Sequence, residues 1–101
     1  MRTYETLRDA LVDLKKRGYN IDFRKDPKWI CCYVYDLWFT PEQFNIDEVY
    51  RFEENSDPAD NSIVYAISSY SGMKGTLIDS YGVYAEYMTF EMAQKFEVNY
   101  L

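Results

Sequence analysis

Histidine is absent from the 101 residues, and this absence excludes several kinds of site at once. A nucleophile–histidine–carboxylate triad, a zinc site with imidazole ligands and a histidine pH switch all need the missing ring. The chain also has no apolar run near the roughly 20 residues that a membrane-spanning helix requires. Its start, Met1–Glu5, lacks the apolar core of a signal peptide, so we expect a cytoplasmic protein with no membrane partner.

Cysteine is scarce and badly placed for structural chemistry. The two cysteines, Cys31 and Cys32, are neighbours, and successive strand residues point to opposite faces of a sheet. They are therefore poorly placed to bridge each other and cannot form a disulfide framework. Further soft ligands are missing too, so the sequence predicts no metal site and no cofactor.

Positive charge is in the minority: 11 Lys and Arg stand against 17 Asp and Glu, for a net charge of −6. A net negative charge repels phosphate backbones and anionic bilayers, so nucleic acid is not an expected partner. The charge is uneven, because residues 1–28 carry a net +3 and residues 29–101 a net −9. Such asymmetry could steer a charged partner, but we favour neutralisation within one fold.

Two amphipathic helices frame the chain. Apolar residues at intervals of three and four predict a helix over residues 3–17, capped by Thr3, with Lys15–Arg17 at the negative end of its dipole and Gly18 as a left-handed stop. Near the other end, Thr89 can cap a short helix through Phe96, in which Met92 and Phe96 are four residues apart.

Between the helices, β-branched and aromatic runs predict a strand pair at residues 29–35 and 37–39, then strands at residues 47–53, 62–68 and 76–81. Thr40-Pro41-Glu42-Gln43 fits a single helical turn between the two groups. Residues 1–101 therefore predict one α+β domain, an antiparallel sheet of four or five strands arranged as a meander, with the N-terminal and C-terminal helices packed on one face.

The aromatic content of the sheet is the best functional clue. One side of the strand at residues 48–53 presents Tyr50 and Phe52, and neither side of the strand at residues 63–67 is plainly polar. Tyrosine suits an intermittently wet surface, because it offers apolar area together with a hydroxyl. The opposing interpretation is that the long N-terminal segment or the C-terminal helix folds over this face and makes it a second core layer.

Two loops offer weaker signals. The acidic loop at residues 55–61 gathers oxygen ligands but lacks the spacing of an EF-hand, so we interpret it as a solvated turn. Gly72-Met73-Lys74-Gly75 matches a GxxG motif, but it joins two predicted strands instead of the two helices that such a nucleic-acid clamp needs.

Three runs resemble a family of short bacterial proteins that are often labelled phosphoribosylpyrophosphate synthetase: residues 47–53, 64–69 and 81–85. The resemblance extends over nearly the whole chain and implies an uncharacterised family. The doubly wound domains of true synthetases need alternating strands and helices, which this chain lacks. In Leu77-Ile78-Asp79-Ser80-Tyr81-Gly82, Ser80 replaces the second acid of a phosphoribosyl loop, and bulky residues follow.

Two hypotheses follow. The first is a small non-catalytic interaction module, able to associate with itself or another protein, that uses the aromatic sheet face with Tyr50 and the edge near Tyr81 and Tyr84. The alternative is a protein or enzyme that binds a sugar phosphate or nucleotide. In this alternative Arg51 and Lys74 contact phosphate, and Asp79 contacts a hydroxyl or metal.

Overall fold

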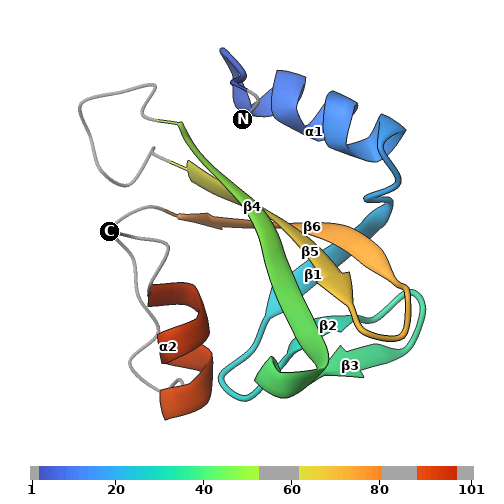
Figure 1. Ribbon diagram of the computed structural model, residues 1–101, viewed down its shortest axis with the longest axis vertical. Helices are drawn as coiled ribbons and strands as arrows, with labels where there is room; N and C mark the ends of the chain where they lie inside the picture. Colours follow the sequence, from blue (N-terminus) through green and yellow to red (C-terminus); the bar gives the residue numbers. More distant parts are fainter. Residues whose placement is uncertain (1–2, 53–61, 81–88, 98–101) are drawn as a thin grey trace.

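The computed structural model describes residues 3–52, 62–80 and 89–97 (Figure 1). In chain order its elements are α1 (Leu7–Lys16), β1 (Ile21–Lys25), β2 (Ile30–Cys32), β3 (Leu37–Phe39), the 3₁₀ turn η1 (Pro41–Gln43), β4 (Phe44–Phe52), β5 (Ser62–Ser69), β6 (Lys74–Ser80) and α2 (Phe90–Glu97). The α+β class is confirmed. Within the described residues, neither helix is long and apolar enough to cross a membrane.

The six strands form one mixed sheet in the order β3-β2-β1-β6-β5-β4. Neighbours pair antiparallel except β1 and β6, which run parallel with Ile21 opposite Gly75 and Phe23 opposite Leu77. The prediction of a wholly antiparallel meander of four or five strands was therefore wrong. The missing strand was β1, which lies in the middle of the sheet and joins the β2–β3 hairpin to the β4–β5–β6 meander.

Both faces of the sheet carry a core. On one face α2 places Met92 and Phe96 against a cluster that includes Phe23, Tyr65 and Leu77. On the other face α1 places Ala10 and Leu14 against Phe52, Val64 and Ala66. Alternation along β5 explains this division, because Ile63, Tyr65 and Ile67 point to α2 whereas Val64 and Ala66 point to α1. The helices thus lie on opposite faces, and the prediction that they share one was wrong.

The helix ends have the capping residues that the sequence predicts, except that the N-cap of α1 lies three residues later. Thr6, and not Thr3, caps α1, because its hydroxyl accepts the backbone N–H of Asp9 at 3.1 Å. Gly18 ends the helix at φ +103°, as predicted. The turn η1 has the expected capping box, and the Thr89 hydroxyl accepts the backbone N–H of Met92 at 3.2 Å at the start of α2.

Gly75 permits the parallel pairing of β1 with β6. A Cβ atom at this position would collide with the backbone oxygen of Ile21 and would lie 2.7 Å from the ring of Phe23. Backbone cannot yield as the end of a flexible side chain can, so any side chain here forces the two strands apart.

We expect Gly75→Ala to lower the free energy of unfolding by about 3 kcal/mol, since it overpacks a buried strand pair. Gly72→Ala is the matched control: Gly72 has φ +99°, but a Cβ atom there would have no neighbour within 4 Å, so only backbone strain of about 1 kcal/mol applies. Urea unfolding of both variants measures the difference. Equal losses would contradict the close approach of β1 and β6.

The turn between β2 and β3 contains the only positive φ of a non-glycine residue in the described segments, at Asp36 (φ 56°). Aspartate tolerates this left-handed conformation better than most residues, but glycine adopts it without steric cost. We expect Asp36→Gly to raise the free energy of unfolding by about 0.5 kcal/mol, whereas Asp36→Val lowers it. Thermal unfolding compares the two, and a stabilising valine would contradict the assigned backbone.

Candidate interaction site

Tyr50 does not lie on an open sheet face. Its ring packs edge-on against Tyr4, with the ring centroids 4.8 Å apart, and its hydroxyl donates to Glu48. Tyr4 and Tyr50 both pack against the core beneath α1. The second of the two interpretations therefore holds at this position: the tyrosine face of β4 is covered by α1 and the segment before it.

The three residues expected to bind a sugar phosphate or nucleotide do not lie together in one site: Arg51, Lys74 and Asp79. Lys74 lies on the α1 side, where its ammonium stands 5.0 Å from the centre of the Tyr19 ring. Asp79 lies on the α2 side and forms an ion pair with Lys25, and both side chains are largely buried. Arg51 is exposed on the edge strand β4. Tyr81 and Tyr84 lie outside the described residues.

Carboxylates and phenols join α1 to β4. Arg17 reaches both carboxylate oxygens of Glu48, with Nη1 3.0 Å from Oε1, and Tyr50 donates to the same carboxylate. One residue earlier the register of β4 against β5 shifts, and Asp47 there accepts the hydroxyl of Tyr19 at 2.8 Å. This network belongs to the packing of α1, and it occupies the polar atoms of two tyrosines that could otherwise meet a partner.

Burial and the neighbouring carboxylates raise the pKa values of the Tyr19 and Tyr50 hydroxyls. Burial, with the hydrogen bond to Asp47, raises the pKa of Tyr19 from 10.0 to about 12. Burial, with the hydrogen bond to Glu48, raises the pKa of Tyr50 to about 12 as well. Both groups therefore remain neutral donors to the carboxylates well beyond neutral pH.

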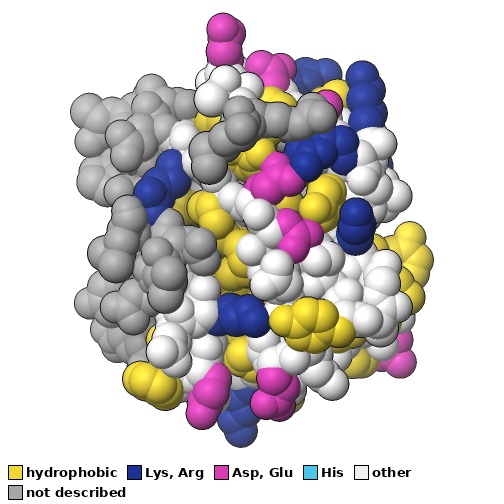
Figure 2. Space-filling model, in the orientation of Figure 1, with side chains coloured by type: hydrophobic (Ala, Val, Ile, Leu, Met, Phe, Trp, Pro, Cys, Tyr) yellow, Lys and Arg dark blue, Asp and Glu magenta, His cyan; other side chains and the backbone are white. Residues whose placement is uncertain are grey.

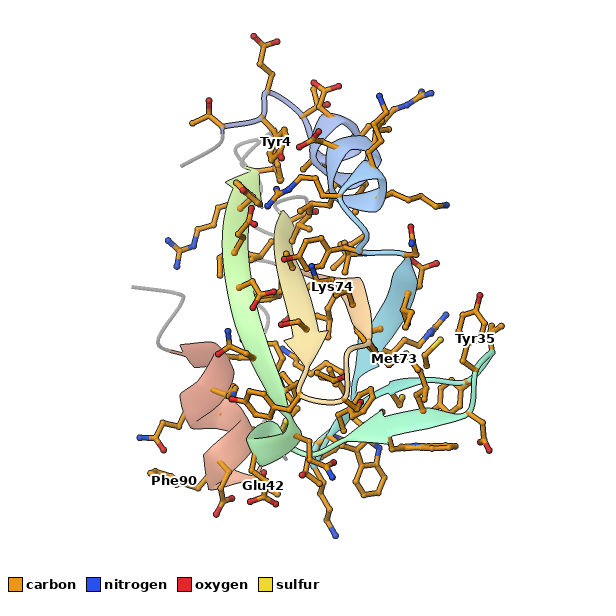
Figure 3. All side chains as sticks on the ribbon, turned by 45° about the vertical axis from the view of Figure 1, so that its right-hand side comes forward. Tyr4, Tyr35, Glu42, Met73, Lys74 and Phe90 are labelled. Atoms are coloured by element: carbon orange, nitrogen blue, oxygen red, sulfur yellow. The ribbon has the colours of Figure 1, made fainter. Side chains whose placement is uncertain are left out.

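The exposed aromatic surface is on the β2–β3 hairpin. We call its four exposed apolar residues the aromatic hairpin; their exposed fractions are 63% for Tyr33, 86% for Val34, 63% for Tyr35 and 42% for Trp38. Tyr33 and Trp38 form an edge-to-face pair, with ring centroids 6.3 Å apart and planes at 82°. Figure 3 shows Tyr35 projecting at the tip of this hairpin, on the side of the molecule away from Phe90 of α2.

One carboxylate organises the base of the hairpin. Oδ2 of Asp26 accepts from the indole N–H of Trp29 at 3.1 Å, the thiol of Cys31 at 3.3 Å and the hydroxyl of Tyr33 at 3.5 Å. Cys31 itself is fully buried, and burial raises the pKa of its thiol. The cysteine is thus an unreactive packing residue, and the Tyr33 ring beside it is held in place although its face is open to solvent.

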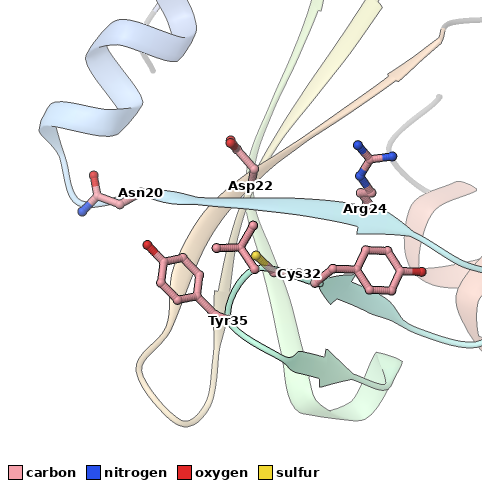
Figure 4. A pocket seen from close by; sticks show the side chains of 7 residues that line it. Asn20, Asp22, Arg24, Cys32 and Tyr35 are labelled. Carbon is pink, nitrogen blue, oxygen red and sulfur yellow. The ribbon is translucent and has the colours of Figure 1, made fainter.

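A pocket of about 380 Å³ adjoins the hairpin, lined by Asn20, Asp22, Arg24, Cys32, Tyr33, Val34 and Tyr35. Asp22 and Arg24 project from the same side of β1 (Figure 4). They are exposed, because the alternate residue Phe23 points into the opposite core. Neither Asp22 nor Arg24 makes a side-chain hydrogen bond or ion pair with the described part of the chain, so both charges are available to a ligand or partner.

The chemistry of this surface favours binding. Across residues 3–52, 62–80 and 89–97 no group of three His, Cys, Asp or Glu residues could hold a metal ion. The lining of the pocket combines two phenol rings, one valine, one cysteine, an amide, a carboxylate and a guanidinium. Such a mixture of rigid rings and separate charges is typical of contact surfaces between proteins.

Comparison of the chain with protein-family models, curated proteins and solved structures finds no match in any of the three. The resemblance to short bacterial proteins therefore stays a prediction, and the functional evidence comes from the surface itself.

Sequence reasoning found the strands that carry the aromatic hairpin but did not single out its side chains. It missed Asn20, Asp22 and Arg24, because it predicted no strand between the first helix and residue 29. A usable signal was present, since Ile21-Asp22-Phe23-Arg24-Lys25 alternates apolar and charged residues until its last position.

The two hydrogen-bonded phenols predict a loss of stability in alkaline solution. A phenol whose pKa is about 12 when folded and 10.0 when unfolded contributes stability below pH 10 that is lost as the pH rises toward 12. We expect the free energy of unfolding to fall between pH 10 and 12, and phenolate absorbance to show that Tyr19 and Tyr50 ionise late. Tyr19→Phe should remove one of them.

Tyr70→Phe is the control for this titration, because the Tyr70 side chain is 72% exposed. The Tyr70→Phe variant should still show the late ionisation of Tyr19 and Tyr50. A native protein in which Tyr19 and Tyr50 ionise near pH 10 would contradict the network at Asp47 and Glu48.

Proposed function

We propose that the protein is a small, non-catalytic interaction module whose contact surface is the aromatic hairpin and the adjoining pocket. The single observation that supports this most is the exposure of four apolar side chains on one four-residue turn and its flanking strand. Exposed apolar side chains scattered singly need no explanation, but rings gathered on one projecting element are typical of binding sites. This surface replaces the one expected around Tyr50.

Ordering of the rings strengthens the proposal. The edge-to-face contact with Trp38 restricts the Tyr33 ring before a partner covers it, so less side-chain freedom is lost on binding. Tyrosine and tryptophan anchored in this way dominate binding energies at many interfaces. Charged Asp22 and Arg24 at the rim would then contribute register and selectivity more than affinity.

A second candidate is a binder of a small phosphorylated sugar or nucleotide, favoured by the pocket volume of about 380 Å³ and by Arg24 in its lining. The residues first suggested for this role, Arg51, Lys74 and Asp79, do not support it. A thermal-shift panel of nucleotides and phosphoribosyl pyrophosphate with Mg²⁺ tests it, since a ligand at 100 times its Kd adds about 2.7 kcal/mol. No shift leaves the interaction module as the better proposal.

Photo-crosslinking tests the interaction surface. We expect p-benzoylphenylalanine at position 35 to give a discrete covalent protein adduct when cells that express the chain are irradiated. The same residue at position 90 should give none, because Phe90 is also well exposed, at 74%, but lies away from the hairpin. Mass spectrometry identifies the adduct.

The free energy of unfolding serves as the control, because both substitutions replace exposed rings and should change it by less than about 0.5 kcal/mol. The absence of an adduct at position 35, or adducts of equal yield at both positions, would contradict the proposed surface.

A further inference from the structure

Three polar side chains follow one another along one wall of the pocket. Asn20, Asp22 and Arg24 alternate with Ile21 and Phe23, which point into the α2 core, so the three polar residues share the opposite face. Figure 4 shows them in succession along β1. Four residues of strand span about 13 Å, so this wall favours an elongated occupant. We call Asn20, Asp22 and Arg24 the polar row.

The polar row is bounded by α1 on one side and by the aromatic hairpin on the other (Figure 1). α1 stands on the same face, where Ala10 and Leu14 pack on Val64 and Ala66. Three of the four residues of the aromatic hairpin also line the pocket. A helix about 10 Å thick stands above the side chains of a strand. A broad, flat partner therefore meets α1 before it reaches the polar row, whereas a single extended chain fits beside the helix.

We propose that the occupant of the pocket is an extended peptide segment of a partner protein, in which a basic and an acidic residue are two positions apart. This inference rests on the proposed interaction function and names the class of partner. It is carried by the spacing and the opposite charges of Asp22 and Arg24 in a pocket that also presents two phenol rings.

The period of an extended chain explains the spacing of the two charges. Alternate residues lie about 7 Å apart on one face, both in β1 and in an extended peptide that lies along it. The side chains of peptide residues i and i+2 therefore match Asp22 and Arg24. A base opposite Asp22 and an acid opposite Arg24 pair both charges, neither of which has an ion pair among the described residues. A spacing of three residues directs one of the two peptide charges away from β1.

The aromatic wall supplies contacts that do not depend on charge. Tyr33 and Tyr35 are each 63% exposed, so their rings offer apolar area to the peptide and their hydroxyls offer hydrogen bonds. The Asn20 amide both donates and accepts, which suits the main chain of a peptide. A basic side chain near either ring also gains a cation–π attraction. The rings thus supply affinity, and the two charges select the peptide.

Charges around the polar row favour a segment that carries both signs. A phosphate bound by Arg24 is repelled by Asp22 beside it and by the net charge of −6. A purely basic segment is repelled by Arg24 and by Lys15 and Lys16 in the last turn of α1, and Figure 2 shows Lys and Arg side chains gathered over this helix. One base and one acid in the same segment give each charge of the row its complement.

Titration of the ¹⁵N-labelled full chain, followed by NMR, tests the inference with two synthetic peptides. The first is acetyl-Ser-Lys-Val-Glu-Ser-amide, and the second has Lys and Glu exchanged, because an extended chain can lie along β1 in either direction. We expect at least one of them to shift the backbone amides of the polar row and of Tyr33, Val34 and Tyr35. Inserting a second Val between the two charges should weaken binding about fivefold, because one ion pair is lost.

Substitutions assign each peptide charge to its partner. Asp22→Asn should weaken binding of the Lys-Val-Glu peptide about fivefold and leave that of a Gln-Val-Glu peptide unchanged. Arg24→Gln should do the converse with a Lys-Val-Gln peptide. Glu91→Gln is the matched control, because it removes an exposed acid from α2 on the opposite face and should change neither affinity. All three positions are exposed, so circular dichroism should show that every variant is folded.

The alternative results separate this inference from the proposed function. No shift with either peptide at millimolar concentration, or affinities that do not depend on the spacing, would overturn the peptide site. Shifts of the same amides by a nucleotide or phosphoribosyl pyrophosphate, but by neither peptide, would overturn it in favour of a small ligand. An adduct at position 35 without peptide binding would overturn this inference and leave the interaction module standing. Neither an adduct nor a shift would remove both.

Discussion

The parallel pairing of β1 with β6 is the interaction on which the rest of the structure depends. It joins the strands β1, β2 and β3 to the β4–β5–β6 meander, and without it the single sheet would be two separate antiparallel pieces of three strands. Gly75 makes the approach possible, because the oxygen of Ile21 occupies the space of a side chain there. The same pairing fixes the orientation of β1, so that Phe23 enters the core and its neighbours Asp22 and Arg24 face solvent.

Unequal coverage of the two faces follows from this arrangement. Every one of the six strands contributes apolar residues to the α2 face, from Leu37 and Phe39 of β3 to Phe44 of β4. On the other face, α1 spans only part of the width, and phenols there turn their hydroxyls to Asp47 and Glu48. The aromatic sheet face expected around Tyr50 is covered by α1, and the exposed rings lie instead on the β2–β3 hairpin. A helix of ten residues cannot cover a six-stranded sheet.

Local patterns predicted the elements whose own sequence determines them. Both helices, η1, the hairpin strands and β4 to β6 follow from periodicity, caps and turn residues. β1 was missed because three of its five residues are charged, and only its place between β2 and β6 makes it a strand. The face chosen by each helix could not be predicted, because β5 is apolar on both sides. Lys74 and Asp79 differ by an odd number of residues on β6, so alternation already places them on opposite faces. Whether α1 covers Tyr50 depends on tertiary packing alone.

Ion pairs formed across the fold neutralise part of the charge asymmetry along the chain. Arg17 pairs with Glu48 and Lys25 pairs with Asp79, so two basic groups of the first 28 residues meet acids of the remaining sequence. Asp22 and Arg24 take no part in this internal neutralisation among the described residues. Because one charge of each sign is thus left exposed beside the aromatic hairpin, this surface carries rings and opposite charges together without a net charge from that pair.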